Sequence, residues 1–311
     1  MAMRERRPAE LVLGSVQLGL PYGIANRTGK PERATALKLV ARAADAGITQ
    51  FDTARAYGDS EERIGEALKS RKTHRAITKL SPLDELAQDA SRAEVRTAVE
   101  ESISASLSAL KRDRLDCLLL HRAAHMSSHG GAIWERLIEY LEQGTIDTLG
   151  VSVQNPEEAL AAIGCKDVRH IQLPFNLLDW RWRAHGVIDR IARRADIVVH
   201  ARSAFLQGLL AANDASIWPP IAFVDAPKIV TLIRELAEDL GRISPADLCL
   251  AYVRGQSWID GVVVGLETEI QLETNLRFFV QKPLTQGQCA LIEARMPHLP
   301  EALLDPSQWP R

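Results

Sequence analysis

The amino-acid sequence predicts a single (β/α)8 TIM barrel of the α/β class. Short runs rich in leucine or β-branched residues alternate with segments whose apolar residues recur at i, i+3 and i+4. This alternation is typical of buried parallel strands that are each followed by a helix. We count eight such repeats in the sequence, and eight is the number that closes a parallel sheet into a barrel. A doubly wound open sheet is the alternative arrangement of the same repeats.

The expected strands are short, and half of them end at a polar side chain. A polar turn separates each strand from the helical pattern that follows it. The strands are expected at residues 11–16, 49–52, 76–79, 116–121, 148–152, 170–173, 197–201 and 261–264.

The helical segments carry boundary signals. Asn155-Pro156 and Ser244-Pro245 each place a capping side chain before a proline at the first helical position. Glycine stands just past three helix ends, where left-handed backbone is needed, at positions 47, 144 and 241. The helices are expected at residues 34–46, 60–68, 92–110, 133–143, 156–163, 187–194, 226–253 as a double segment, and 269–279.

Length and composition favour one domain with a small-molecule partner. The chain has 311 residues, of which 46% are hydrophobic and 25% charged, and its net charge of -2 indicates neither a nucleic-acid nor a membrane partner. No linker interrupts the repeats, so we expect one domain over residues 1–311, with residues 283–311 forming a C-terminal tail packed on the barrel. The long stretch 204–227 is the expected active-site loop.

The sequence also favours a cytoplasmic location. The apolar stretch 11–20 after the basic N-terminus is short and broken by Gly and Gln, so we expect no signal peptide. A spanning helix would need a run of about 18 apolar residues, and the sequence contains none. Cys117, Cys165, Cys249 and Cys289 are scattered, which argues against a zinc site and a disulfide framework and favours buried thiols.

The carboxyl ends of the strands carry the chemistry in a (β/α)8 barrel. The residues expected there, or just beyond a strand, are Asp52, Tyr57, Lys79, His121, Ser152, Gln172, Arg202 and Gly265. A single carboxylate among them is too few for a divalent metal site or for the paired carboxylates of a glycosidase. We therefore expect no metal.

Four of these side chains form a coherent set for proton transfer at a carbonyl group. A tyrosine can act as a general acid or base near neutral pH only if a nearby cation favours its phenolate, and Lys79 is the cation available to Tyr57. Asp52 is the partner that keeps Lys79 charged in a partly dry barrel mouth. His121 can donate a hydrogen bond to the substrate oxygen.

Six segments resemble the aldo-keto reductase superfamily in order and spacing, and together they extend over nearly the whole chain. They are FDTARAYGDSEERIG at 51–65, ITKL at 77–80, LLLHR at 118–122, GVSV at 150–153, IQLPFN at 171–176 and VVVGLETEIQLETN at 262–275. The catalytic tetrad of that family falls on Asp52, Tyr57, Lys79 and His121. The resemblance implies that Tyr57 protonates the carbonyl oxygen while a reduced nicotinamide supplies hydride, that oxidation reverses these steps, and that the protein is a monomer.

The resemblance also implies where a nicotinamide cofactor binds. Ser152 and Gln172 would contact the carboxamide. The segment 203–208 would lie along the pyrophosphate, and the segment 265–275 would surround the adenosine. The corresponding contact residues are Arg202, Ser203, Leu206, Gly208, Gly265, Glu267, Gln271 and Asn275.

Three departures from the family pattern concern this cofactor. Val153 replaces the asparagine of a Ser-Asn pair, so one carboxamide contact must come from elsewhere or be lost. Arg202 replaces an aromatic ring, and its charge should disfavour the oxidised nicotinamide ring or bind an anionic substrate. Glu267 stands where NADPH-dependent members usually place a cation. NAD(H) is therefore favoured, while Arg277 or Lys282 leaves NADP(H) open.

Two other functions stay open at this point. The first is a catalytically silent, cofactor-binding regulatory member of the same fold. The second is a barrel isomerase or lyase that uses Lys79 as a Schiff-base amine. The joint occurrence of the four tetrad residues favours the oxidoreductase, with a small carbonyl or alcohol compound as substrate.

Overall fold

Eight parallel strands form a closed barrel in the computed structural model, which describes residues 8–71 and 73–310. Each strand pairs with the next along the chain, and the first pairs with the last from Glu10 opposite Gly261 to Gly14 opposite Gly265. This closure confirms the (β/α)8 prediction and excludes the open sheet. The strands are β1 Glu10–Gly14, β2 Gln50–Asp52, β3 Arg75–Lys79, β4 Cys117–Leu120, β5 Leu149–Ser152, β6 His170–Pro174, β7 Val198–Arg202 and β8 Gly261–Gly265.

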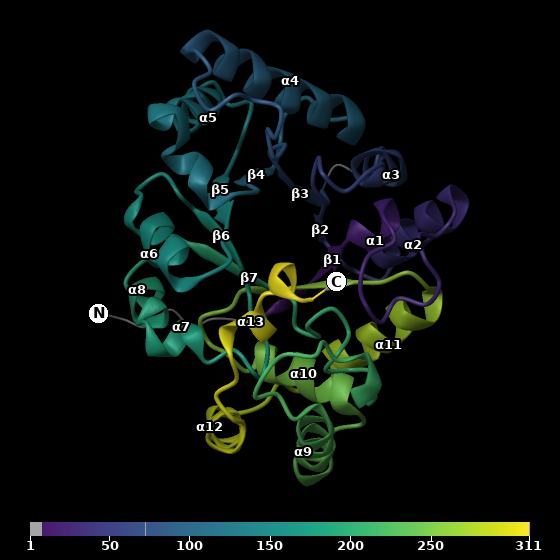
Figure 1. Cartoon of the computed structure of the whole chain (residues 1–311). Helices are drawn as coiled ribbons and strands as arrows, with labels where there is room; N and C mark the ends of the chain where they lie inside the picture. The colour runs from purple at the N-terminus through teal and green to yellow at the C-terminus, as the bar shows by residue number, and fades with distance from the viewer. Residues whose placement is uncertain (1–7, 72, 311) are drawn as a thin grey trace.

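The helices surround the strands as a ring, from α2 and α3 through α4, α5, α6 and α8 to α9, α10 and α11 (Figure 1). Their bounds are α1 Val16–Gly19, α2 Arg33–Asp45, α3 Ser60–Ala67, α4 Arg92–Leu110, α5 Ala132–Glu142, α6 Pro156–Gly164, α7 Arg181–Ala184, α8 Val187–Ala192, α9 Ala226–Asp239, α10 Pro245–Arg254, α11 Glu269–Val280, α12 Gln286–Arg295 and α13 Glu301–Leu304. Short 3-10 turns occupy Ala123–Met126, Ser128–Gly131, Ala215–Ile217 and Pro306–Gln308.

The predicted helix boundaries follow from local hydrogen bonding. The side chain of Asn155 accepts a hydrogen bond from the backbone of Glu158, and that of Ser244 accepts one from Asp247, so both predicted caps are confirmed. The three predicted glycines all have positive φ, +92° at position 47, +75° at 144 and +63° at 241. The predicted double segment is two helices, α9 and α10, and the second of them begins after the cap at Ser244.

Five strand ends differ from the prediction: β6, β7 and β8 run one residue further, to Pro174, Arg202 and Gly265, whereas β1 and β4 stop early. The first strand stops at Gly14 instead of continuing to residue 16, because Ser15 turns toward the neighbouring strand. Its backbone N–H donates to the carbonyl of Asp52 at 3.0 Å and its hydroxyl donates to the same oxygen at 2.6 Å. The chain then forms the short helix α1. The fourth strand ends at Leu120, one residue before the predicted His121.

The tail after α11 packs on the barrel through apolar side chains. Leu284, Cys289, Ile292, Leu303 and Leu304 are buried in the main hydrophobic cluster. Three of the four cysteines are buried, and Cys165 is half-buried, contrary to the expectation that all would be buried. In the described part of the chain, no helix has the length and apolarity that crossing a membrane requires. Residues 1–7, the basic stretch for which we expected no signal peptide, lie outside the described residues.

Candidate active site

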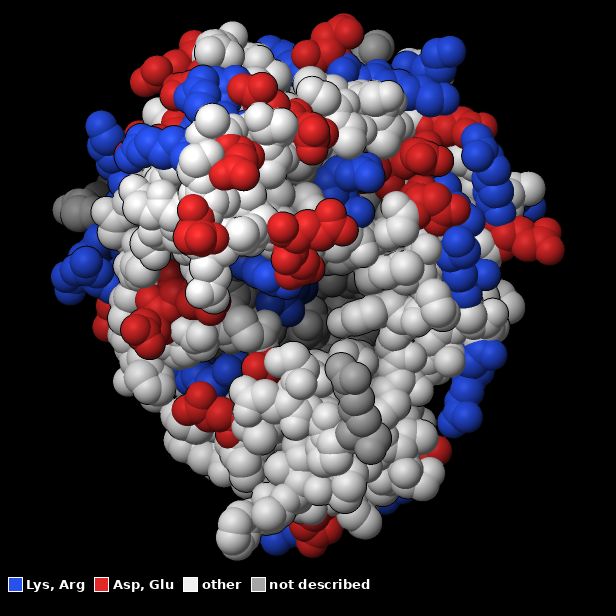
Figure 2. Space-filling model, turned by 45° about the horizontal axis from the view of Figure 1, so that its top comes forward, with Lys and Arg blue, Asp and Glu red and all other residues white. Residues whose placement is uncertain are grey.

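A cavity of about 1060 Å³ opens at the carboxyl ends of the strands. Figure 2 shows a hollow near the middle of the molecule, with charged side chains along its upper rim and a largely uncharged surface below. The predicted site residues that line the cavity are Asp52, Tyr57, His121, Ser152, Gln172, Arg202, Ser203, Gly208, Gly265, Glu267, Gln271 and Asn275. The strand ends and the segments that follow them therefore form one continuous wall.

A buried ion pair lies beneath this wall. Lys79 Nζ is 2.8 Å from both carboxylate oxygens of Asp52 and donates to the carbonyl of Thr53 at 2.9 Å. The two side chains are only 1% and 4% exposed. Burial alone would lower the pKa of Lys79, but the carboxylate of Asp52, with Tyr57 nearby, raises it above the usual value. Lys79 is thus a fixed cation.

Tyr57 and His121 lie above this cation. Lys79 Nζ is 5.0 Å from the centre of the Tyr57 ring. The rings of Tyr57 and His121 are 5.7 Å apart and nearly perpendicular, at 85°. The four residues named by the sequence therefore come together from three strand ends and one loop.

The backbone at Tyr57 is held by a close approach of helix α1. A Cβ atom on Gly19 would lie 1.7 Å from the carbonyl oxygen of Tyr57, so only glycine fits there. The same carbonyl accepts a hydrogen bond from the N–H of Ser60 at 3.1 Å. The Ser60 hydroxyl is in turn bonded to those of Ser15 at 2.6 Å and Thr53 at 2.9 Å. Buried contacts on both sides thus fix the turn that carries Tyr57.

His121 is neutral at physiological pH. Burial lowers its pKa to about 3, and the charges of Lys79, Arg202 and Arg122 act in the same direction. Its Nδ1 is buried and has no partner among the described residues. A neutral imidazole has one N–H to donate, which suits a ring that faces a substrate oxygen.

Gln172 connects the ion pair to the adjacent wall. Its Nε2 donates to Asp52 Oδ2 at 2.7 Å, whereas its buried Oε1 has no partner in the described chain. Ser152 lies opposite Gln172 in the strand register of β5 and β6. An unpaired buried acceptor at this position is suited to a ligand N–H group.

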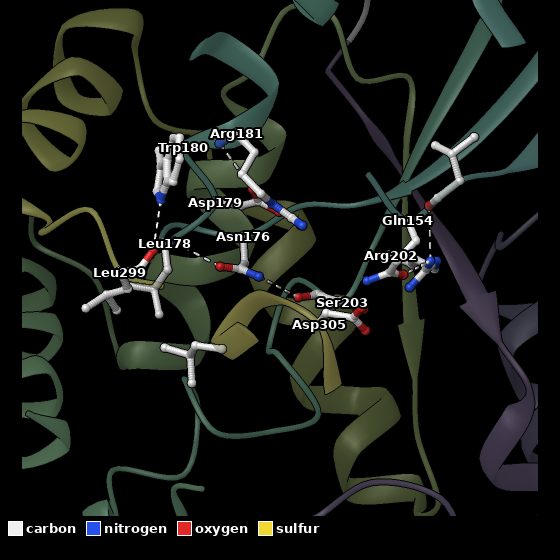
Figure 3. A network of polar contacts seen from close by, with 12 residues as sticks. Gln154, Asn176, Leu178, Asp179, Trp180, Arg181, Arg202, Ser203, Leu299 and Asp305 are labelled. Atoms are coloured by element: carbon white, nitrogen blue, oxygen red, sulfur yellow. Dashed lines mark hydrogen bonds and ion pairs between the residues drawn. The ribbon is translucent and has the colours of Figure 1, made fainter. Parts of the chain in front are cut away.

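The end of β7 forms the next part of the wall, where Arg202 and Ser203 lie near one another (Figure 3). Arg202 donates to the carbonyl of Val153 at 3.2 Å and to Gln154 Oε1 at 2.8 Å. Ser203 receives a hydrogen bond on its carbonyl from the side chain of Asn176 at 3.4 Å.

The loop after Ser203 has unusual backbone geometry. Ser203, Leu206, Gln207 and Gly208 have φ values of +61°, +46°, +55° and +97°. The loop is built of tight turns, in which the N–H groups of Leu206 and Gly208 donate to the carbonyls of Ser203 and Phe205, each at 2.9 Å. The side chain of Leu206 is 1% exposed and packs in the core instead of lining the cavity, so it does not offer the expected cofactor contact.

The far end of the cavity is formed by β8 and α11. Gln271 closes the capping box of α11, and its Oε1 accepts from the N–H groups of Glu267 and Thr268. Its amide oxygen thus has a structural role, and the Thr268-x-x-Gln271 spacing is a sequence signal for it that was missed. Arg277 and Lys282, the two cations that left NADP(H) open, are not among the lining residues.

Several lining residues were missed from the sequence. Gln17 and Tyr22 come from the segment after β1, Gln154 and Glu158 from the start of α6, and Ser244, Ala246 and Phe278 from the far end. Gln154 had a usable signal, because it lies between the strand-end residue Ser152 and the predicted helix start at Asn155-Pro156, which places it at the carboxyl end of β5. The other positions depend on how loops fold over the barrel.

Comparisons with known proteins agree with this architecture. A sequence model of the Aldo/keto reductase family matches residues 10–296. The uncharacterized oxidoreductase YqkF of Bacillus subtilis (strain 168) is 26% identical over 314 residues, covering 92% of each protein. The aldo-keto reductase YhdN of the same organism is 28% identical over 155 residues, covering 49% of this chain and 46% of YhdN.

A solved structure supports the fold independently. The aldo-keto reductase AKR11C1 from Bacillus halodurans (holo form) matches with a TM-score of 0.75 at 22% identity, covering 93% of each chain. Fold and family match together define a (β/α)8-barrel oxidoreductase. The chain belongs to the aldo/keto reductase family, as the resemblance indicated.

Proposed function

We propose that this protein transfers hydride between NAD(H) and a small aldehyde, ketone or sugar-type alcohol, with Tyr57 as the general acid and base. The observation that carries the proposal is the buried Lys79 cation, held by Asp52 below the Tyr57 ring beside a neutral His121. The positive charge stabilises a phenolate, so the Tyr57 hydroxyl can give its proton to a carbonyl oxygen and recover it in the reverse direction. His121 donates a hydrogen bond that orients the same oxygen.

The cavity has suitable partners for each part of a dinucleotide. Gln172 offers an unpaired acceptor at the tetrad end. The segment 203–208 borders the cavity beside the Arg202 guanidinium, and a pyrophosphate would lie along it. Glu267 and Asn275 line the opposite end and suit ribose and adenine groups. When bound, the nicotinamide would supply or accept the hydride.

The charges of the cavity favour NAD(H) over NADP(H). Beyond Gly265, the described lining residues include Glu267 but no lysine or arginine. A carboxylate can accept hydrogen bonds from ribose hydroxyls, and it repels the dianionic 2′-phosphate.

Titration with NADH and NADPH, followed by quenching of intrinsic fluorescence, tests the cofactor directly. We expect tighter binding of NADH in the wild type and a reversed preference in Glu267→Arg. The matched control is Glu101→Arg, which places the same charge change on the exposed surface of α4. If the wild type bound neither dinucleotide, the oxidoreductase proposal would be wrong for this site.

Replacement of Tyr57 tests the chemistry separately. Tyr57→Phe removes the hydroxyl and keeps the ring, so we expect NADH affinity to be retained while turnover falls by about 10²- to 10⁴-fold. Stopped-flow measurement of cofactor oxidation with a panel of aldehydes would show the change. Full activity in the variant would remove Tyr57 from the mechanism.

The Schiff-base alternative loses support from the same geometry. Lys79 Nζ already contacts Asp52 and Thr53 and is 1% exposed, so it does not present a free amine to the cavity. Borohydride treatment in the presence of candidate aldehydes should therefore leave Lys79 unmodified, as judged by mass spectrometry.

A further inference from the structure

Val153 leaves a polar position of the expected cofactor site unfilled. Its side chain is fully buried and belongs to the main hydrophobic cluster, although the residue borders the cavity. Its polar contacts are made by the backbone alone: the carbonyl oxygen accepts from Arg202 at 3.2 Å, and the N–H donates to the carbonyl of Gln172 at 2.8 Å. The side chain therefore offers no hydrogen bond to a ligand.

Gln154, the next residue, lines the cavity and carries an unpaired donor. Its Oε1 accepts from Arg202 at 2.8 Å, while its Nε2 is buried and has no partner among the described residues. The orientation of this amide follows from chemistry, because a guanidinium only donates and so must face the oxygen. Figure 3 shows Gln154 beside Arg202 with this contact drawn.

Gln172 has the opposite arrangement. A carboxylate only accepts, so Asp52 must face the Gln172 Nε2, at 2.7 Å, and the Oε1 is left as the unpaired end. Gln172 lies on β6 opposite Ser152 of β5, and Gln154 follows Ser152 by two residues. Two lining residues on neighbouring chain segments thus carry one unpaired acceptor and one unpaired donor, and both atoms are buried.

The start of helix α6 fixes the position of Gln154. Its backbone N–H donates to Glu158 Oε2 at 2.7 Å, and the Glu158 N–H donates to Asn155 Oδ1 at 2.9 Å. Pro156 occupies the first helical position. The backbone of Gln154 is therefore held by the capped start of α6, and its side-chain amide is held by Arg202.

We infer that Gln154 is a cofactor-binding residue, whose Nε2 donates to the carbonyl oxygen of the nicotinamide carboxamide while Gln172 Oε1 accepts from the carboxamide NH2. A carboxamide has both an acceptor and a donor, so it satisfies both orphaned groups at once. Gln154 thereby takes over the contact that Val153 cannot make. The inference rests on the proposed function, because it assigns a contact to the proposed cofactor.

Calorimetric binding of NADH and of ADP-ribose tests this assignment, because ADP-ribose lacks the nicotinamide. Gln154→Leu removes the donor together with the acceptor for Arg202. Gln154→Glu removes the donor but keeps an oxygen for Arg202, so it preserves the local contact. We expect both variants to bind NADH roughly 3- to 10-fold more weakly, the equivalent of one hydrogen bond, and to bind ADP-ribose as the wild type does.

Two controls isolate the carboxamide contact. Gln286→Leu, at an exposed position of α12 outside the cavity, should bind both ligands normally. An NADH analogue with sulfur in place of the carboxamide oxygen is a weaker acceptor. The wild type should therefore bind it less tightly than NADH, and Gln154→Leu should lose this discrimination.

The outcomes separate this inference from the proposed function. Unchanged NADH affinity in Gln154→Glu, or equal loss of NADH and ADP-ribose, would overturn the role of Gln154 and leave the proposed function standing. A wild type that binds neither dinucleotide nor ADP-ribose would overturn both. Urea denaturation of the variants without ligand, compared with that of the wild type, checks that the substitutions leave the fold intact.

Discussion

At the scale of single residues, the ion pair of Lys79 and Asp52 matters for stability as well as for chemistry, because both charges are almost fully removed from water. Lys79→Met leaves the Asp52 carboxylate with Gln172 as a remaining partner. Removing one member of a buried pair costs about 3–5 kcal/mol in unfolding free energy, and we expect the lower end of that range. Urea denaturation measures the loss. The control is Lys30→Met, whose exposed pair with Asp59 should be worth less than about 1 kcal/mol; equal losses would contradict the argument.

The protonation of His121 is a second prediction at this scale. With its pKa lowered to about 3, mainly by burial, the ring stays neutral as the pH falls from 8 to 5. We expect its ring nitrogen resonances, followed by NMR with ¹⁵N-labelled histidine, to be constant over that range. His121→Asn should change the rate of carbonyl reduction but not its pH profile. A ring that titrates near the ordinary value of about 6.5 would contradict the prediction.

The sequence predicted single residues well where a strand end dictated their direction. Asp52, Lys79, Ser152 and Arg202 are each the last residue of a strand, so their place at the barrel mouth followed from counting. The pairing of the Gln154 amide was not readable, because it depends on a guanidinium 48 positions away along the chain.

Helix α1 positions Tyr57 at the scale of elements. Gly19→Ala would place a methyl group 1.7 Å from the carbonyl oxygen of Tyr57, so the turn must move. We expect a loss of about 1–3 kcal/mol in stability. We also expect a fall in turnover of up to about 100-fold, because small displacements of a catalytic group are costly. Gly164→Ala is the control, since nothing lies within 4 Å of its added Cβ, and it should be neutral or slightly stabilising.

Elements were predictable to the extent that their signals are local. The caps at Asn155 and Ser244 are set by residues within three positions, and both were correct. The end of β1 was wrong because a tertiary contact decides it. Ser15 bonds to Asp52, which is 37 positions away, and this contact overrides the strand propensity of Val16.

At the scale of the whole molecule, the barrel topology could be predicted from the repeat count, because eight alternating units leave few ways to pair parallel strands. The shape of the cavity did not follow from it. Segments distant in sequence, such as the loop after β1, the start of α6 and helix α11, meet around one space, and only the folded chain shows which side chains face it.

Two buried histidines in the barrel interior make the stability of the whole molecule depend on pH. His170 and His200 are fully withdrawn from water, with ring centres 4.3 Å apart, and His200 has no hydrogen-bond partner among the described residues. Burial, followed by the charges of Arg75 and Lys79, lowers the pKa of His200 to about 3, and burial also lowers that of His170. In the unfolded chain these rings take up protons near pH 6.5, so the unfolded state binds more protons between about pH 6.5 and 3.

Unfolding free energy should therefore fall as the pH is lowered through that window. Each such histidine contributes a slope of about 1.4 kcal/mol per pH unit. His200→Val removes one of these proton sites, so urea denaturation between pH 7 and 4 should show a shallower loss than in the wild type. Val199→Ala, at the preceding buried position of β7, should lower stability at every pH and leave the slope unchanged. An unaltered slope in His200→Val would mean that this ring already carries its proton inside the folded barrel.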